Sequence, residues 1–198
     1  MSLVALLVLL FLVCGPVFYA ITLYNGLISV RAEVDRAWAN IDVLLKQRYD
    51  EIARLVEVCK GYMQYERETL LAITEARARF AQAVTVAQKA DASGTMTSSV
   101  QRLFVTAESY PELKASESFA TLQKRITDLE NQIADRREFY NDAVTHFNVR
   151  IQQMPDAMMA GMMGLEQRVM FHAKPAERTA PISSVKVPAE ARVPQGQL

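Results

Sequence analysis

The chain has 198 residues, of which 51% are hydrophobic and 22% are charged. Its 22 Lys and Arg residues balance 22 Asp and Glu residues, so it lacks the basic surplus with which nucleic-acid-binding proteins attract phosphate. Seven Gly and seven Pro are few for a β-sandwich or barrel with many turns, and two Cys do not make a disulfide framework. The composition therefore indicates a helical protein and argues against nucleic acid as a partner.

The first segment, residues 2–24, contains no charged residue, and 19 of its 23 residues are apolar. As a helix it would span roughly 34 Å, enough to cross a hydrocarbon core of about 30 Å. A cleaved signal peptide would have a basic start and a shorter apolar run. No other segment is apolar enough to enclose this one as a core helix. We therefore expect an uncleaved transmembrane anchor, with the lipid bilayer as a partner.

The charges that flank this segment bear on its orientation. Arg31 and Arg36 follow it within about 15 residues, whereas no Lys or Arg precedes it. By the positive-inside rule, this difference favours a single-pass protein with its N-terminus outside and the rest of the chain in the cytoplasm.

Four helices are expected after the anchor, because apolar residues recur there at spacings of three and four, as in coiled-coil packing. The first helix, about 25–63, has one stutter and no proline. Whether it is continuous with the anchor as a single helix is left open. The fourth, about 116–153, carries the most regular series. The apolar residues of these two long helices are Leu27, Val30, Val34, Ala37, Ile41, Leu44, Leu45, Tyr49, Ile52, Val56, Cys59 and Met63, then Phe119, Leu122, Ile126, Leu129, Ile133, Tyr140, Ala143, Val144, Phe147 and Ile151.

Two shorter helices are expected between the long ones. The second, about 66–91, would end near Gly94, a residue typical of a helix C-terminus. The third, about 97–110, would end before Pro111, because the residue before a proline avoids the α region. The predicted fold class is therefore all-α. An N-terminal transmembrane helix precedes an antiparallel four-helix bundle with two long and two shorter helices.

The predicted domains are the anchor (2–24), the bundle (25–172) and a tail (173–198). The tail holds four of the seven prolines and almost no aromatic residue, a composition typical of disorder.

Polar candidates lie on the two long helices. They are Asp42, Lys46, Arg48 and Asp50 on the first, and Arg137, Tyr140, Asn141 and Asp142 on the last. We expect structural pairs such as Asp42 with Lys46 at i,i+4, and Arg137 with a carboxylate across helices. Asn141 and Asp142 are unfavourable in helices, which suggests hydrogen bonds between helices. The sequence offers neither two acids with a reason for split pKa values nor the Glu-x-x-His pairs of di-iron bundles. No catalytic residue, cofactor or metal is therefore expected.

Six of the nine methionines lie between residues 154 and 170, and residues 157–165 carry no charge. The candidates for contact are Met158, Met159, Met162 and Met163. This segment either lies in the bilayer interface beside the anchor or packs on the base of the bundle. A methionine-rich surface for a protein partner is a third alternative.

Short motifs spread in order over about residues 24–172 resemble those of LemA-family proteins. They are Tyr24-Asn25-Gly26-Leu27, Ala37-Trp38-Ala39-Asn40-Ile41-Asp42-Val43, Lys46-x-Arg48-Tyr49-Asp50, Lys60-Gly61-Tyr62, Glu66-x-Glu68-Thr69-Leu70, Thr74-Glu75-Ala76-Arg77, Tyr110-Pro111-Glu112-Leu113-Lys114-Ala115, Glu130-Asn131-x-Ile133-Ala134-x-x-Arg137, Tyr140-Asn141-Asp142-Ala143-Val144 and Pro155-Asp156. The methionine-rich residues after Pro155-Asp156 depart from the family pattern, which often has aromatic and branched residues there.

The resemblance implies a bacterial inner-membrane protein with a short N-terminus outside and a helical bundle in the cytoplasm. It implies no particular enzymatic activity. We therefore expect a membrane-anchored helical scaffold or protein-interaction module that binds an unidentified protein or forms a homo-oligomer. The alternative is a sensor or receptor input domain that relays ligand binding through the helix joined to the anchor. A hydrolase would need a pocket with converging Asp and Arg side chains.

Overall fold

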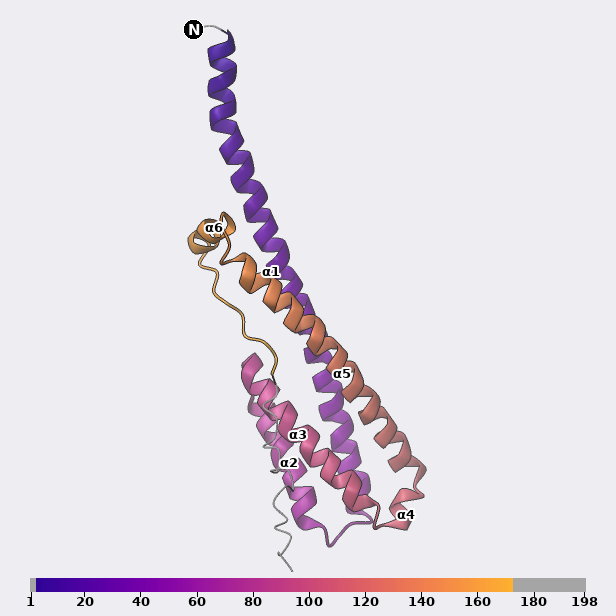
Figure 1. Cartoon of the computed structure of the whole chain (residues 1–198). Coiled ribbons are helices and arrows are strands. Elements are labelled where there is room, and N and C mark those ends of the chain that lie inside the picture. The colour runs from indigo at the N-terminus through magenta and orange to yellow at the C-terminus, as the bar shows by residue number, and fades with distance from the viewer. Residues whose placement is uncertain (1–2, 173–198) are drawn as a thin grey trace, which may run out of the picture.

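A computed structural model describes residues 3–172, and the tail expected at 173–198 lies outside the described residues. The helices are α1 (Leu3–Lys60), α2 (Arg67–Gln82), α3 (Val86–Ala107), α4 (Pro111–Lys114), α5 (Glu117–Arg150) and α6 (Asp156–Met162) (Figure 1). No strand occurs in the part of the chain that the structure describes. The all-helical class is therefore confirmed.

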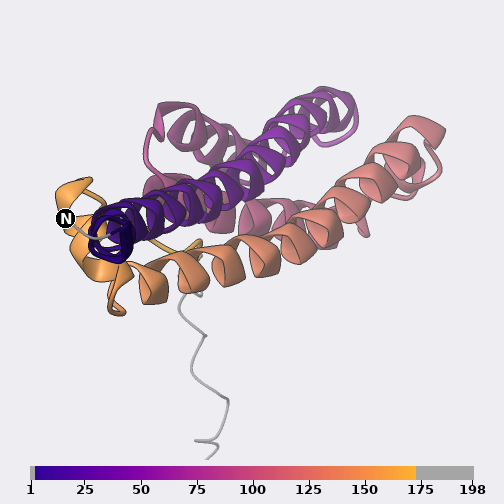
Figure 2. The same ribbon diagram turned by 90° about the horizontal axis from the view of Figure 1, so that it is seen from above.

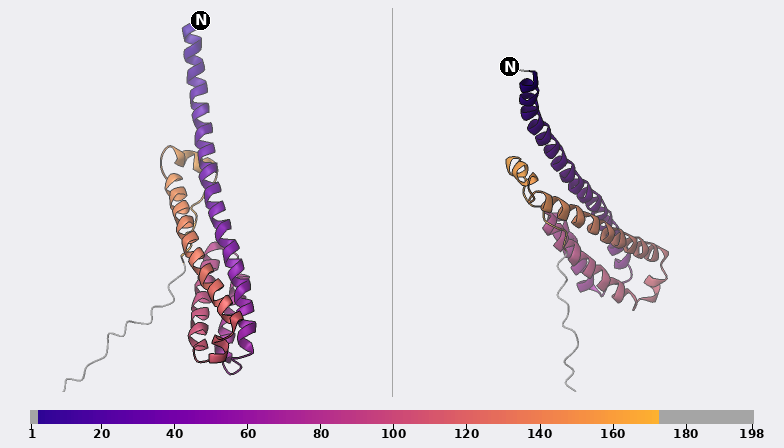
Figure 3. Two further views of the ribbon diagram at one scale, coloured as in Figure 1. Left: turned by 90° about the vertical axis from the view of Figure 1, so that its right-hand side faces the viewer. Right: turned by 45° about the horizontal axis from the view of Figure 1, so that its top comes forward.

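The anchor segment and the first long helix form one continuous helix, α1, of 58 residues. At about 1.5 Å per residue it is about 87 Å long. Its N-terminal part stands clear of the other helices (Figures 1 and 3), and Phe11 and Phe18 there are 80% and 70% exposed. Among the described residues, α1 is the one helix long and apolar enough to cross a membrane. The same helix thus supplies the anchor and part of the core.

The rest of α1 pairs with α5, which runs back beside it (Figures 1 and 2). The apolar series predicted for these two helices lies along this contact. Every member is buried except Ala37, Leu44, Tyr49 and Ala143, which are partly buried. The spacing in the sequence therefore identified the packing face of both long helices correctly.

The shorter helices α2 and α3 form a hairpin against the half of the α1–α5 pair that is farther from the N-terminus (Figure 1). The predicted break near Gly94 is wrong, because Gly94 lies inside α3. The chain turns instead at 83–85, where the Thr85 hydroxyl accepts a hydrogen bond from the Gln88 amide (3.2 Å) and the Gln88 side chain accepts one from the Thr85 amide (3.1 Å). This reciprocal capping box starts α3 earlier than a glycine-based boundary predicts.

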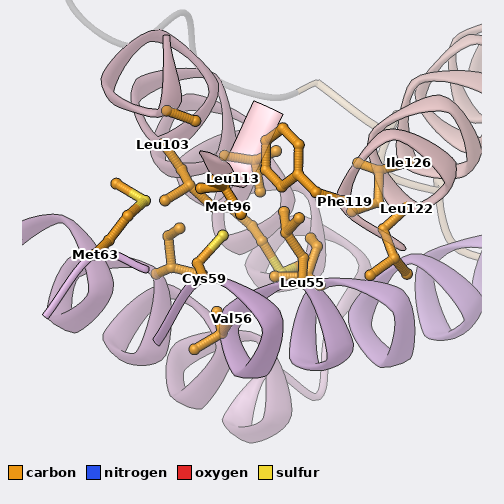
Figure 4. Close-up of a cluster of buried hydrophobic side chains, with 14 of the residues drawn as sticks. Leu55, Val56, Cys59, Met63, Met96, Leu103, Leu113, Phe119, Leu122 and Ile126 are labelled. Atoms are coloured by element: carbon orange, nitrogen blue, oxygen red, sulfur yellow. The ribbon is translucent and has the colours of Figure 1, made fainter. Parts of the chain in front are cut away.

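The buried apolar side chains form two clusters along the molecule. The distal cluster, far from the N-terminus, takes residues from α1 to α5, including Leu55, Cys59 and Phe119, which point toward one another in Figure 4. The proximal cluster lies between α1 and α5, nearer the N-terminus, and includes Leu27 and Phe147. Burial raises the pKa of the Cys59 thiol to about 11, so this cysteine acts as a small core residue rather than a reactive one.

An irregular segment completes the proximal half. After α6 the chain returns along the α1–α5 pair as residues 165–172, which we call the strap (Figure 1). Phe171 of the strap is fully buried in the proximal cluster. The strap and α6 therefore cover the part of the pair that the α2–α3 hairpin leaves open.

Candidate functional site

A polar layer, buried at its centre and partly exposed at its edge, lies between the two apolar clusters. Its four members are Arg48 of α1, Ser93 and Thr97 of α3, and Glu130 of α5. Arg48, Ser93 and Glu130 each sit between a residue of the proximal cluster and one of the distal cluster on their own helix, and Thr97 follows Ser93 one turn later. These flanking pairs are Leu45 and Ile52, Ala90 and Met96, and Ile133 and Ile126.

Arg48 is the centre of this layer and is fully buried. Its Nη1 donates to the Glu130 carboxylate at 2.7 Å and to the Thr97 hydroxyl at 3.0 Å, and its Nη2 donates to the Ser93 hydroxyl at 2.7 Å. Burial lowers the pKa of the guanidinium, and the Glu130 carboxylate opposes that effect. Arginine stays charged even so, because its ordinary pKa is very high.

The chemistry of this layer is that of a structural ion pair. A buried charge pair gives little net stability, but loss of one partner leaves the other charge uncompensated, so such pairs favour one helix register over others. Arg48 thus joins three helices at a single level. Its Nε has no hydrogen-bond partner, so the bonds of Nη1 and Nη2 are what compensate for burying the guanidinium.

The other polar candidates of α1 line a cavity beside this layer. Asp42 forms its ion pair with Lys89 of α3, so the expected pair with Lys46 is wrong. Lys46 and Asp50 are exposed, and together with Asp42 and Lys89 they line a cavity of about 330 Å³. The α2–α3 hairpin brings Lys89 close to α1, an approach that the sequence of α1 alone does not reveal.

Three candidates of α5 hold the strap. The Tyr140 hydroxyl donates to the Val169 carbonyl at 2.8 Å, and burial raises the pKa of that hydroxyl. The Asn141 side chain accepts from the Phe171 amide at 2.8 Å and donates to the Phe171 carbonyl at 3.4 Å. Asn141 therefore binds the strap rather than another helix. Arg137 was expected to pair with a carboxylate across helices. Its guanidinium lies instead over the Phe171 ring, 5.2 Å from the ring centroid.

A second asparagine repeats this contact one heptad later. Asn148 accepts from the Arg168 amide and donates to the Arg168 carbonyl, both at 2.8 Å. Seven helical residues rise about 10.5 Å, and three extended residues span about 10 Å, so Asn141 and Asn148 match Phe171 and Arg168 in spacing. Asp142, between them in sequence, is exposed.

The last group of contacts ties the start of α6 to α1. Arg150, at the end of α5, donates from Nε to the Asp156 carboxylate (2.8 Å) and from Nη1 to the Gly26 carbonyl (3.2 Å). A Cβ at position 26 would lie 2.3 Å from Arg150 Nη2, so glycine permits this approach. These bonds place α6 beside the point where the apolar segment of α1 ends.

The methionine candidates fall on two sides of α6. Met159 and Met163 pack against the proximal cluster, whereas Met158 and Met162 are 65% and 84% exposed. Packing on the base of the bundle, one of the two main alternatives, therefore applies to the first pair only. The second pair faces away from the protein.

Sequence reasoning missed the burial of Arg48 and the whole strap. Arg48 follows Leu45 by three residues and precedes Ile52 by four, so it occupies a core position of the heptad series. The seven-residue spacing of Asn141 and Asn148 was the available signal for the strap. Within residues 3–172, no three His, Cys, Asp or Glu side chains gather as metal ligands would.

Together, a long helix exposed and apolar at one end and a helical domain built on its other end define a membrane-associated helical protein. The sequence model of the LemA family matches residues 37–186, and the chain belongs to this family.

Individual relatives agree with the family match. The chain is 26% identical over 174 residues to Protein LemA of Metamycoplasma hominis, covering 86% of this chain and 80% of the relative. It is 30% identical over 88 residues to the magnetosome protein MamQ of Magnetospirillum gryphiswaldense and to MamQ 1 of Paramagnetospirillum magneticum, covering 44% of this chain and 32% of each relative. The match thus spans about a third of the length of the MamQ proteins.

Proposed function

We propose that this protein is a membrane-anchored helical scaffold that presents one face of its bundle to another protein or to a second copy of itself. The observation that carries the proposal is the continuity of α1 from an exposed apolar segment into the core. Because the two parts share one helix, the domain would stand at a defined height and angle above the bilayer. Such positioning suits an interaction module.

In this proposal α1, α2, α3 and α5 form an antiparallel four-helix bundle with two long and two shorter members. The contribution of all four to the distal cluster supports this arrangement. We place the protein in the bacterial inner membrane, crossing once, with its N-terminus outside and the bundle in the cytoplasm. The bacterial relatives support the first point, and Arg31 and Arg36 after the apolar segment support the orientation.

We further propose that the protein is not an enzyme and carries no cofactor. The charged residues that could have served chemistry are engaged in pairs that join helices: Arg48 with Glu130, Asp42 with Lys89, and Arg150 with Asp156. The names of the MamQ relatives refer to the magnetosome and state no reaction.

The face offered for interaction is the side of the α1–α5 pair that carries a groove of about 460 Å³. Its lining mixes both signs of charge and includes Asp50, Arg54, Arg125, Asp128 and Gln132. Charges of both signs in a groove favour a protein partner with a matching charge pattern, because complementary potentials select partners.

Photo-crosslinking tests this face. A photoreactive amino acid replaces Gln132 in the groove, and in the matched control it replaces Gln101, which is exposed on α3. We expect position 132 to give a discrete adduct in intact membranes and position 101 to give none. Two differently tagged copies of the chain then distinguish a homo-oligomer from another partner. The absence of an adduct at 132, or equal adducts at both positions, would contradict the proposal.

The sensor alternative is favoured by the cavity of about 330 Å³ between α1 and the α2–α3 hairpin, because α1 is the helix that contains the anchor. A small zwitterionic ligand would fit the mixed charges of Lys46, Asp50 and Lys89. If position 132 gives no adduct and such a compound raises the melting temperature of the wild type but not of a Lys46→Ala variant, the sensor function replaces the scaffold.

A further inference from the structure

We infer that α6 is a second membrane contact: a short helix that lies at the boundary of headgroups and acyl chains and inserts Met158 and Met162 into the lipid, together with Met154 of the preceding turn. The inference rests on the membrane anchoring of α1 stated in the proposed function. It adds a lipid-binding surface that belongs to the bundle itself rather than to the anchor.

The height of α6 along α1 is fixed by hydrogen bonds. Arg150 binds the Gly26 carbonyl at 3.2 Å and the carboxylate of Asp156, the first residue of α6, at 2.8 Å. Gly26 is two residues beyond Tyr24, the end of the apolar segment, which is about 3 Å along the helix axis. α6 therefore starts at the level where α1 leaves the hydrocarbon region. Seen from the N-terminal end, α6 lies beside α1 (Figure 2).

The outward face of α6 is apolar and carries no charge. Ala160 is buried against the proximal cluster, which fixes the rotation of the helix. On α6, Met158 and Met162 are spaced by four and are 65% and 84% exposed, and Met154, in the turn before α6, is 70% exposed. Residues 157–165 contain no charged side chain. An interfacial helix normally turns one face to lipid and a charged face to water. In α6 the face opposite the exposed methionines packs on the bundle instead, so it does not need charges.

Lipid explains this surface better than a protein does. A helix of seven residues is about 10.5 Å long and about 10 Å wide, so its outward face is far smaller than the roughly 800 Å² that each partner buries in a stable protein interface. The face is also adjacent to lipid already, because Tyr24 and Ile28 of α1 are exposed at the same level. Unbranched methionine side chains adapt well to the disordered surroundings of acyl chains.

A fluorescence depth measurement on the full chain in vesicles tests the inference. Cys14 is replaced by Ser, and Cys59 stays because it is fully buried. Single cysteines at Met158 or Met162 then carry an environment-sensitive nitrobenzoxadiazole label. Phe11, exposed in the apolar segment, is the lipid control, and Val105, 69% exposed on α3, is the water control. The vesicles contain phosphatidylcholine and phosphatidylglycerol, with bromine near the headgroup end or near the tail of the acyl chains.

Labels at 158 and 162 should emit at shorter wavelength than the label at 105. They should lose more than half of their fluorescence with bromine near the headgroup end, and the label at 11 should lose more with bromine near the tail. If 158 and 162 behave like 105 while 11 is quenched, the inference is overturned and the anchor stands. If they are shielded from water but not quenched, a second copy covers α6 and the inference is equally wrong. Lack of quenching at 11 refutes the anchor, and the inference with it.

Discussion

Arg48 shows how one residue organises three helices. It occupies a core position of α1, and its guanidinium binds groups of α3 and α5. An apolar residue would pack there with less demand on geometry, whereas the arginine satisfies its donors only when the three helices are in one register. The polar layer lies between the two apolar clusters and thus opposes a shift of the three helices along one another.

Replacement of Arg48 by Met should destabilise the domain by about 3 kcal/mol, because Glu130 loses its charged partner in a largely buried setting. Adding Glu130→Gln to Arg48→Met should recover most of that loss, since no unpaired charge remains. Urea unfolding in mild detergent, followed by circular dichroism, measures both. Arg125→Met is the control, because Arg125 is 59% exposed and its pair with Glu51 lies at the surface, where about 1 kcal/mol or less is expected. An equal cost for the single and double variants would contradict the role given to the charge pair.

Asn141 makes a second prediction at the residue scale. Its side chain accepts the hydrogen bond of the Phe171 amide, so Asn141→Ala should let that amide exchange with solvent about tenfold faster, the equivalent of one lost hydrogen bond. Hydrogen–deuterium exchange read on residues 168–172 measures the effect. Asn131→Ala, at an exposed position of the same helix, should leave the exchange unchanged. Unchanged protection in the Asn141 variant would mean that the strap is held by other contacts.

At the scale of the element, helix faces were easier to predict than helix ends. The recurring apolar residues identified the contact between α1 and α5 because burial of apolar area dominates long amphipathic helices. The boundary of α2 and α3 was misplaced because Gly94 weakens a helix only slightly, whereas Thr85 and Gln88 stop one helix and start the next. The strap could not be predicted from periodicity, because it has no regular structure and is held by side chains of another element.

Thr85 provides the test at this scale. Thr85→Ala should cost about 1 kcal/mol of unfolding free energy, because the Gln88 amide loses its acceptor, and Thr85→Ser should cost little. Thermal unfolding of the three proteins measures the difference. Thr95→Ala, in the exposed interior of α3, is the control and should leave the unfolding free energy within about 0.5 kcal/mol of the wild type. If the two alanine variants lose the same stability, the capping box does not define the start of α3.

At the scale of the whole molecule, one helix connects the anchor with both apolar clusters. The apolar segment of α1 ends at Tyr24, and the Gly26 carbonyl accepts a hydrogen bond from Arg150. The helix then continues through both clusters to Lys60. The candidate polar residues, which the sequence suggested as a group, separate in space into a buried layer, a cavity lining and a clamp for the strap. This separation fits a domain whose charges position helices, and it is why their chemistry could not be inferred from sequence proximity alone.

Extraction of bacterial envelopes with alkaline carbonate tests the central claim, membrane anchoring through α1, most directly. The full chain should stay in the membrane pellet. A Phe11→Arg/Val13→Arg variant should move to the supernatant, because each arginine near the middle of a membrane span costs about 2.5–3.5 kcal/mol. Val105→Arg, on the exposed surface of α3, should remain in the pellet. Release of the unaltered chain by carbonate would contradict the account.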